Sequence, residues 1–412
     1  MIALARSWCL RTWLFSALTA FLLLPSVPEV AAQEIDFSGF IAGEFRLFPE
    51  PAKHGGQKDQ HLNPSLILQP ELALTWEGAA FQRLSFIPFL RLDAQDGTRT
   101  HSDIRELNYL YAADGWDIRI GIDKVFWGVA ESRHLVDIVN QTDLTENPDG
   151  EDKLGQPMIN LGLQTAWGDI NAFILPYFRK RSFPGRAGRL RAALPVSTGT
   201  ARYESAARQW HPDFALRYAG VFGEWDVGLS QFYGTAREPI LSPTLEGGRA
   251  VLVPRYQIIA QTGVDVQATL DDWLLKLEAI RRSGQGDAFY AVTAGFEYSF
   301  YGVIAGSGDL GLVGEYHYDG RDSKAPQSLY DKDIFVGLRF TLNDEADSSL
   351  LAGTLTDLGN GASLLTLEGE RRLNDTWKIE VEATAFAFAD TDDPAYALRG
   401  DHYLQIRLSR YF

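Results

Sequence analysis

Apolar and polar residues alternate along most of the chain between Ile35 and Phe412, so that every second residue is apolar. The segment 377–383, WKIEVEA, is representative, because its odd-numbered residues are apolar and its even-numbered residues are Lys or Glu. Successive side chains of a β-strand point to opposite faces, so this period of two predicts strands with one apolar and one polar face. The same pattern over 115–123 and 401–412 predicts further strands, up to the last residue.

The number of strands and the order of their connections predict a closed barrel. About eighteen strands of about ten residues can be placed from residue 35 onward, with short turns alternating with long polar loops. A bilayer core offers no water to backbone amides, so a chain without long apolar helices can cross it only by closing a sheet on itself. We therefore expect residues 33–412 to form an all-β, up-and-down antiparallel transmembrane β-barrel of about 18 strands, with 16 as the alternative count. The strands expected at 349–358 and 361–373 decide between these counts, because the turn between them is very tight for an outer loop.

Residues 1–32 have the composition of an export signal, because two arginines precede an apolar run over 13–24 and a small-residue cleavage site precedes Gln33. The only cysteine, Cys9, lies inside this segment, so the exported chain is expected to have neither a disulfide nor a thiolate metal site. The seven histidines show no metal-ligand spacing, and we expect no metal and no cofactor. Export followed by barrel formation predicts the bacterial outer membrane as the location.

The tryptophans predict which end of the barrel carries the short turns. Amphipathic indole rings prefer the interface between membrane and water. Six tryptophans lie beside short turns that follow even-numbered strands, which are periplasmic if the first strand rises from the periplasm. A secreted β-sandwich with core tryptophans, the alternative fold, does not predict such one-sided placement. The expected periplasmic aromatic girdle is Trp76, Trp116, Trp167, Trp225, Trp273 and Trp377.

The segment 124–158 is too long for a turn and is the strongest candidate for a functional loop. Its first half is apolar enough to predict a short helix, and its second half is acidic, so that the segment carries a net charge of -4. One interpretation is a constriction loop whose carboxylates and Arg133 set pore size and selectivity; the alternative is a plug or brace against the wall. The candidate residues are Trp127, Glu131, Arg133, Asp137, Asp143, Glu146, Asp149, Glu151 and Asp152.

Charged residues of both signs occupy the polar faces of the strands and are predicted to line the lumen. A wet, charged interior is typical of a pathway for hydrophilic solutes, although a closed interior held by salt bridges has the same pattern. About eighteen strands enclose more space than side chains can fill, which favours the channel. The predicted lining is Arg91, Asp93, Glu106, Asp117, Arg119, Lys276, Glu278, Arg282, Glu368, Glu370, Arg372, Lys378, Glu380 and Glu382.

A basic outer loop over 179–208 reverses the charge of an otherwise acidic chain, with a local net charge of +7 against -16 overall. The overall acidity argues against nucleic acid as a partner. The loop has three interpretations: it attracts anionic solutes, it binds lipopolysaccharide phosphates, or it forms salt bridges with the acidic segment. The residues in question are Arg186, Arg189, Arg191, Arg202 and Arg208.

The strand pattern, the alternating loops and the terminal Phe412 together resemble Gram-negative porins over the whole exported chain. The tract Phe126-Trp127-Gly128, followed by Glu131-Ser132, is also similar to uncharacterised porin-like families that have a Trp-Gly-Glu-Ser tract, although Val129-Ala130 interrupt that tract here. The resemblance implies passive diffusion of small hydrophilic solutes or ions without enzymatic activity, often in a homotrimer within outer-membrane lipid. It also implies that the barrel assembly machinery recognises Phe412. The alternatives are a barrel enzyme acting on lipids and a barrel scaffold enclosing a partner protein.

Overall fold

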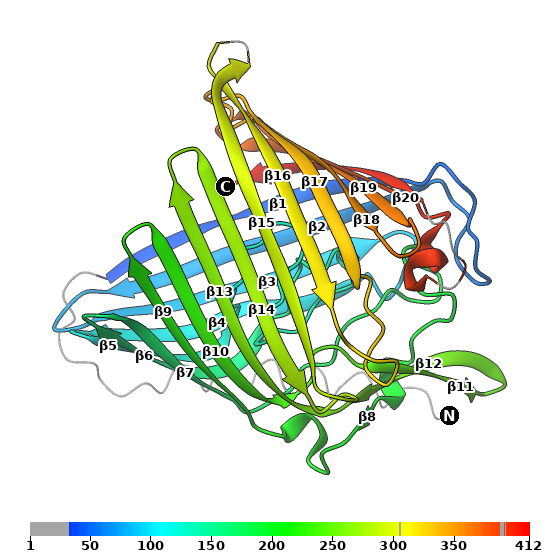
Figure 1. The fold of residues 1–412 in the computed structure, drawn as a ribbon, viewed down its shortest axis with the longest axis horizontal. Coiled ribbons are helices and arrows are strands. Elements are labelled where there is room, and N and C mark those ends of the chain that lie inside the picture. The colour runs from blue at the N-terminus through cyan, green and yellow to red at the C-terminus, as the bar shows by residue number, and fades with distance from the viewer. Residues whose placement is uncertain (1–32, 305, 388–390, 392) are drawn as a thin grey trace, which may run out of the picture.

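Eighteen strands form one closed antiparallel sheet in the computed structural model, which describes residues 33–304, 306–387, 391 and 393–412 (Figure 1). The expected export signal, with Cys9, lies outside the described residues. Each strand pairs with the next along the chain, and β21 closes the barrel on β1, from Phe40↔Tyr411 to Leu47↔Leu404. The predicted count of 18 is confirmed, and the alternative of 16 is wrong. The barrel strands are β1 (Gln33–Leu47), β2 (Leu62–Trp76), β3 (Phe81–Asp93), β4 (His101–Ala113), β5 (Trp116–Asp123), β6 (Gln156–Thr165), β7 (Gly168–Leu175), β9 (Asp213–Phe222), β10 (Trp225–Thr235), β13 (Ile258–Leu270), β14 (Trp273–Ser283), β15 (Phe289–Ile304), β16 (Gly308–Asp319), β17 (Lys332–Thr341), β18 (Ser349–Asp357), β19 (Ser363–Asn374), β20 (Trp377–Ala387) and β21 (Tyr403–Tyr411).

The tight connection between β18 and β19 is stabilised by its own turn chemistry. The Asp357 carboxylate accepts hydrogen bonds from the backbone amides of Gly359, at 2.6 Å, and Asn360, at 3.3 Å. Gly361 has φ +77°, a left-handed conformation that glycine adopts without steric cost. This turn lets the two strands pair from Ser349↔Glu370 to Thr356↔Ser363.

The short turns and the long loops lie at opposite ends of the barrel, called here the turn end and the loop end. Two-residue turns follow β4, β9 and β13 at the turn end. The same end holds the described N-terminus and Phe412, whose backbone amide donates to the Gly39 carbonyl at 3.1 Å. Each of the six predicted girdle tryptophans borders or lies within a short connection at this end.

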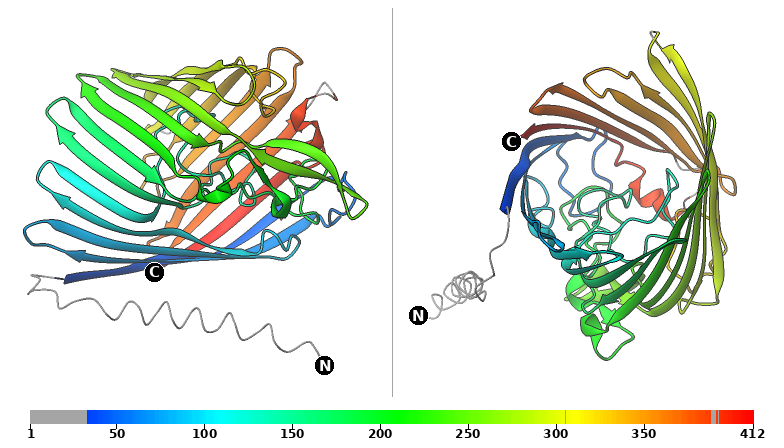
Figure 2. Two further views of the ribbon diagram at one scale, coloured as in Figure 1. Left: turned by 90° about the horizontal axis from the view of Figure 1, so that it is seen from below. Right: turned by 90° about the vertical axis from the view of Figure 1, so that its left-hand side faces the viewer.

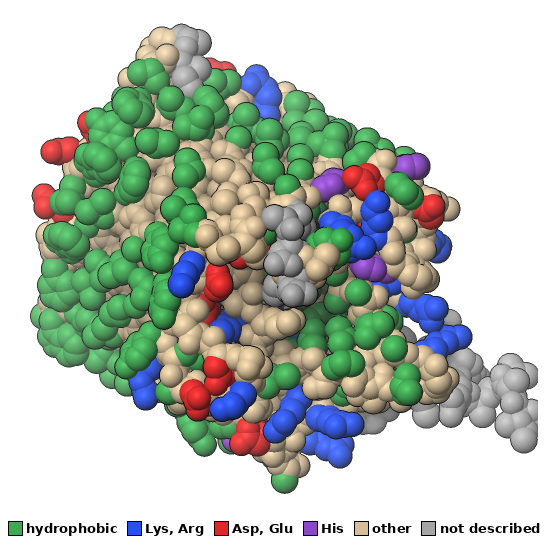
Figure 3. All heavy atoms as spheres, turned by 45° about the vertical axis from the view of Figure 1, so that its right-hand side comes forward, with side chains coloured by type: hydrophobic (Ala, Val, Ile, Leu, Met, Phe, Trp, Pro, Cys, Tyr) green, Lys and Arg blue, Asp and Glu red, His purple; other side chains and the backbone are tan. Residues whose placement is uncertain are grey.

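The outer and inner faces of the barrel differ in polarity, as the period of two predicts. On β1, Ile35 and Phe37 face outward with 63% and 64% of their surface exposed, whereas Glu44 and Arg46 face inward and are buried. Hydrophobic side chains cover the wall at the left of Figure 3, and charged side chains gather toward the loop end. No helix within the described ranges is long and apolar enough to cross a membrane.

A small second sheet, which is not part of the barrel wall, lies at the loop end. The alternation over 254–269 predicts a single strand, but the structure divides it at Gln257, which separates β12 (Arg249–Tyr256) from β13. β12 pairs with β11 (Ile240–Glu246) through a turn in which Gly247 and Gly248 have φ +55° and +79°, and it pairs in parallel with β8 (Arg202–Tyr203). Short 3-10 helices occur at η1 (Thr198–Thr200), η2 (Arg208–Trp210) and η3 (Pro394–Leu398).

Candidate functional site: the lumen and its inward-folded loop

The chain leaves the barrel wall after β5 and re-enters it at β6, and residues 124–155 between them fold into the lumen. In the right-hand view of Figure 2, cyan and green loop segments lie inside the ring of strands. The loop predicted over 124–158 is three residues shorter in the structure, because β6 begins at Gln156. The helix expected in its first half is absent from this segment. The physical reason is that its backbone amides donate to side-chain carboxylates instead of to carbonyls within the loop.

Two glutamates from the wall hold the first half of the loop. Glu278 of β14 accepts hydrogen bonds from the amides of Val129 at 2.7 Å, Ala130 at 2.9 Å and Val136 at 3.1 Å. Such charge-assisted bonds are stronger than bonds between neutral groups. The alternation along β14 predicts that Glu278 lines a water-filled lumen. In the structure, Glu278 instead fixes the path of the loop.

Glu315 of β16 holds the next two residues in the same way. It accepts hydrogen bonds from the amide of Glu131 at 2.6 Å and from the amide and hydroxyl of Ser132 at 2.9 and 2.7 Å. Within the loop, the Asp137 carboxylate accepts hydrogen bonds from the backbone amides of Trp127 and Gly128 at 2.7 and 3.0 Å. Seven backbone amides are thus satisfied by three carboxylates, which gives the segment a defined shape without regular secondary structure.

Apolar packing closes one side of the lumen around the same half of the loop. Leu135 and Val136 pack with Ile280, Phe289, Ala291 and Ala325, and Ile138 and Val139 pack with a second cluster that includes Phe173 and Phe232. Trp127 contacts both clusters, with its ring 5.8 Å from that of Phe173. Sequence reasoning assigned only polar side chains to the inner wall and missed this dry region. The available signal was the apolar character of both faces of segments such as INAFIL in β7.

The second half of the loop is attached to the opposite wall through a buried ionic cluster. Arg91 of β3 is fully buried between Glu44 of β1 and Glu146 of the loop, with its Nη1 and Nε each 2.8 Å from a carboxylate oxygen. Arg99 and Arg407 also donate to Glu44, at 2.7 and 2.8 Å. Arg91 was predicted to line the lumen, but the structure removes it from water completely.

The predicted loop residues therefore divide into two groups. Trp127, Asp137, Asp143 and Glu146 hold the loop in place; Asp143, for example, accepts from Arg105 at 3.0 Å. Arg133 pairs with Asp319 at 2.5 Å and lies over the Tyr330 ring, 4.6 Å from its centroid. The remaining predicted residues face open space and are Glu131, Asp149, Glu151 and Asp152.

An acidic chamber of about 590 Å³ lies on the turn-end side of the loop. The two arginines in its lining are Arg339 and Arg407, and Arg339 pairs with Glu131 at 2.7 Å. Carboxylates outnumber these two cations, so the chamber favours positive ions in its water. The carboxylates that line it are Glu131, Asp149, Glu151, Asp152, Glu368, Glu370, Glu380 and Glu382.

A second hollow of about 710 Å³, the vestibule, lies on the loop-end side. Its arginines gather around Glu238, which accepts from Arg282 at 2.7 Å and Arg321 at 3.2 Å. Asp149 and Glu151 line both the vestibule and the acidic chamber, so this stretch of the loop separates the two spaces. Of the vestibule arginines, sequence reasoning missed Arg237 and Arg321, although each follows the end of a strand, where a side chain can reach the barrel mouth. The vestibule arginines are Arg133, Arg181, Arg237, Arg282 and Arg321.

Two carboxyl groups in the acidic half of the loop, those of Asp149 and Asp152, have perturbed acidities. Limited hydration and repulsion from Asp152 raise the pKa of Asp149 to about 8. Limited hydration and repulsion from Glu146 raise the pKa of Asp152 to about 6. His134 is desolvated, which favours its neutral form, but Glu151 and Glu278 prevail and raise its pKa to about 10. The charge of the loop therefore changes across neutral pH through its carboxyl groups and not through His134.

The other predicted lumen residues have varied surroundings. Asp93 pairs with Arg99 at 2.8 Å, Lys276 with Glu131 at 3.4 Å, and Lys378 with Glu370 at 2.7 Å. Arg119 pairs with Asp123, and Arg372 pairs with Asp347 at 2.9 Å near the turn end. In the described part of the chain, no ion pair involves the two half-buried carboxylates Glu106 and Asp117.

The predicted arginines of the basic outer loop are partly buried and partly exposed in the structure. Arg189 is buried, with Nε 2.5 Å from Asp401, and buried Arg191 donates to the carbonyls of Ala192 and Ala193 at 2.8 and 2.9 Å. Arg186, Arg202 and Arg208 are exposed. Part of the predicted basic surface therefore stabilises the loops, and part of it faces solvent.

Comparison with known proteins supports the barrel architecture alone. No protein-family model and no curated protein matches the sequence. A solved BenF-like porin from Pseudomonas fluorescens is 11% identical, with 92% of this chain and 98% of that chain covered and a TM-score of 0.53. The in-vitro folded trimer form of OmpT, an outer membrane protein of Vibrio cholerae, is 10% identical over 93% and 100% of the chains, with a TM-score of 0.48. The closed 18-strand barrel and the similarity to the BenF-like structure show that the chain has the fold of an outer-membrane porin.

Proposed function

We propose that the protein is a porin-like channel of the bacterial outer membrane through which small hydrophilic solutes or ions diffuse passively. The observation that carries the proposal is that Asp149 and Glu151 line both the vestibule and the acidic chamber. A solute that passes from one space to the other where they adjoin passes these two side chains of the inward-folded loop. The loop is then the constriction, and it is fixed there by its bonds to opposite walls.

The distribution of charge supports a preference for cations at this constriction. On the turn-end side, crowded carboxylates face two arginines, whereas on the loop-end side four of the five arginines pair with Glu238, Asp319 or Asp213. A charged surface in a narrow, water-filled space raises the local concentration of ions of opposite sign. We therefore infer a cation-selective channel.

The hydrogen bonding of Ser132 and His317, which are close enough to suggest a catalytic pair, favours a channel over an enzyme. The Ser132 hydroxyl lies 2.9 Å from His317 Nε2, and it donates to Glu315 at 2.7 Å. Because that proton is directed to Glu315, His317 donates to the serine oxygen and does not act as its general base. Thr293 lies 3.0 Å from the other ring nitrogen, His317 Nδ1, where a catalytic triad has a carboxylate.

Single-channel recording in planar bilayers tests the proposal. We expect stepwise openings and, in a salt gradient, a reversal potential of the sign given by cation selectivity. At pH 9, where both carboxyl groups are ionised, Asp149→Asn with Asp152→Asn should shift that potential toward zero, because it removes two negative charges from the lining of the acidic chamber. The matched control is Asp375→Asn, which makes the same chemical change at one position in the exposed turn between β19 and β20. Silence in the bilayer, hydrolysis of added phospholipid, or an equal shift in the control would contradict the proposal.

Two partner interactions stay predictions that follow from the porin-like fold. We infer a homotrimer, which cross-linking of the purified protein in detergent would detect as a three-subunit band. We also infer that the assembly machinery recognises the C-terminal strand through Phe412. Replacing this residue by serine should reduce the amount of folded barrel in the membrane without changing the amount synthesised.

A further inference from the structure

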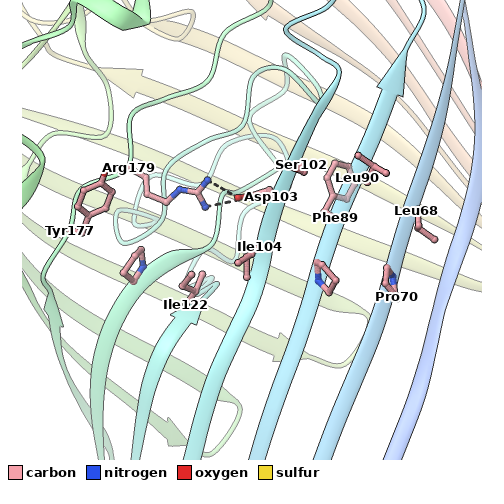
Figure 4. A pocket seen from close by; sticks show the side chains of 12 residues that line it. Leu68, Pro70, Phe89, Leu90, Ser102, Asp103, Ile104, Ile122, Tyr177 and Arg179 are labelled. Carbon is pink, nitrogen blue, oxygen red and sulfur yellow. Dashed lines mark hydrogen bonds and ion pairs between the residues drawn. The ribbon is translucent and has the colours of Figure 1, made fainter. Parts of the chain in front are cut away.

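The outer, membrane-facing wall of the barrel contains a hollow of about 670 Å³ near the loop end (Figure 4). It extends across β2 to β6, and most of its lining residues belong to the outward-facing set of these strands. The hollow is much more apolar than the chambers inside the barrel. Its principal lining residues are Leu68, Pro70, Pro88, Leu90, Ile104 and Ile122.

The sequence produces this hollow by interrupting the sheet at two places. The pairing of β2 with β3 stops after Leu68↔Leu90 and resumes only at Leu72↔Phe86, and the gap contains Pro70 and Pro88, which have no amide to donate. In addition, β5 pairs with β4 only from Leu107↔Ile122 to the turn end. The outer part of β4 therefore has no sheet neighbour on that side, and the wall is recessed.

An ion pair closes the floor of the recess against the lumen. Arg179, from the loop after β7, reaches back across the gap and donates to Asp103 at 2.7 Å and to the Gly155 carbonyl at 2.7 Å. Figure 4 shows this guanidinium between Tyr177 and the strand that holds Asp103. The recess is therefore a dead-end groove that opens toward the membrane and not a leak through the wall.

The groove changes from apolar to cationic along its length. Pro70 and Leu68 lie toward the middle of the wall, whereas Tyr177 lines the groove at the loop end. The Tyr177 ring is 4.8 Å from that of Trp210, which is 70% exposed, and indole rings of this kind favour the headgroup level of a membrane. Beside Trp210, Arg208 is exposed and makes no ion pair within the described part of the chain, and the same holds for Arg202 nearby on β8.

We propose that this groove binds one acyl chain of an anionic membrane lipid, with the lipid headgroup at the rim beside Trp210 and Arg208. An amphiphile matches both ends of the groove, because its chain fills the apolar part and its negative group meets unpaired guanidinium groups. The proposal depends on the membrane-embedded barrel and not on the channel activity.

Native mass spectrometry of the delipidated protein, with added phosphatidylglycerol or phosphatidylcholine of identical chains, tests this site. We expect one retained lipid and at least tenfold tighter retention of the anionic one. Ile104→Trp should fill the groove and reduce retention at least tenfold. The matched control is Leu338→Trp, an outward-facing position of β17 on the far side of the barrel that is 40% exposed. Arg202→Glu with Arg208→Glu should remove the preference for the anionic lipid while leaving the chain site in place.

Three outcomes would overturn the proposal. Equal retention by wild type and Ile104→Trp would show that the lipid binds elsewhere. Equal retention of both lipids by the wild type would contradict the assignment of the headgroup to the arginine rim. Loss of oligomers in Ile104→Trp, without any lipid retained by the wild type, would identify the groove as a contact between subunits. The heat-dependent migration of the folded barrel on gels confirms in each case that the variant is folded.

Discussion

Replacing Glu278 by glutamine should release the first half of the inward-folded loop from the wall. Glu278 is buried under the loop and accepts three of its amides, at 2.7, 2.9 and 3.1 Å. Glutamine retains one oxygen for the amides of Val129 and Ala130, but its NH₂ group then faces the amide of Val136. One hydrogen bond is lost, two lose their charge assistance, and a buried amide is left without a partner.

The size of the effect follows from these bonds. Hydrogen bonds to charged groups contribute about 1.5–3 kcal/mol each, and those between neutral groups about 1 kcal/mol. We expect the docked loop to lose about 3 kcal/mol in total, which raises the population of the undocked loop about 100-fold. Single-channel records of Glu278→Gln should therefore show frequent excursions to a higher conductance level, and limited proteolysis should cut within 129–136.

Glu106→Gln is the matched control, because Glu106 is a half-buried lumen residue that makes no ion pair within the described residues. It should leave both measurements unchanged. If Glu278→Gln also leaves the conductance fluctuations and the protease pattern unchanged while the barrel is folded, the apolar contacts of Leu135 and Val136 hold the loop alone. The assigned role of the wall carboxylates would then be wrong.

Three further predictions concern charge and stability. The pKa values of Asp149 and Asp152 are raised to about 8 and about 6, so both groups lose protons between pH 5 and 9. Cation selectivity, measured from reversal potentials, should therefore rise with pH over this range. It should not change with pH in the double variant Asp149→Asn with Asp152→Asn. Arg91→Met leaves Glu146 buried without its partner and should cost about 3 kcal/mol in urea unfolding from vesicles; Arg91→Met with Glu146→Gln should recover part of this loss, and no recovery would contradict the buried pair. Arg179→Met removes the closer of the two arginines that pair with Asp103 and opens the floor of the recess, so it should cost about 1–3 kcal/mol in the same assay and raise the conductance; an unchanged conductance would contradict the closure of the floor by this guanidinium.

The barrel was predictable from the sequence because a period of two is a local property of each strand. The segment WKIEVEA is sufficient to identify β20, and the glycine and aspartate turns identify where strands end. The apolar interior around the loop was not predictable in this way. Phe173 and Phe232 occupy inward positions, but their burial depends on Ile138 and Val139, which are far away in sequence.

The same limitation applies to the candidate site. The acidic half of the loop was identified from its composition, and Asp149, Glu151 and Asp152 do face open space. The sequence does not distinguish them from Glu146, which is buried against Arg91, because this arginine is 55 residues away and belongs to β3 in the wall. Long-range pairing therefore decides which carboxylates meet solutes and which hold the loop.

The attachment of the inward-folded loop also constrains the order of barrel biogenesis. The amides of Val129 and Ser132 find their acceptors on β14 and β16, 149 and 183 residues later in the chain. Until those strands have been inserted, the loop has no completed surface on which to settle. The inward-folded loop is thus one of the last features to mature, because a chain stalled before β16 lacks both the acceptors that place the loop and the pairing of β21 with β1 that closes the barrel.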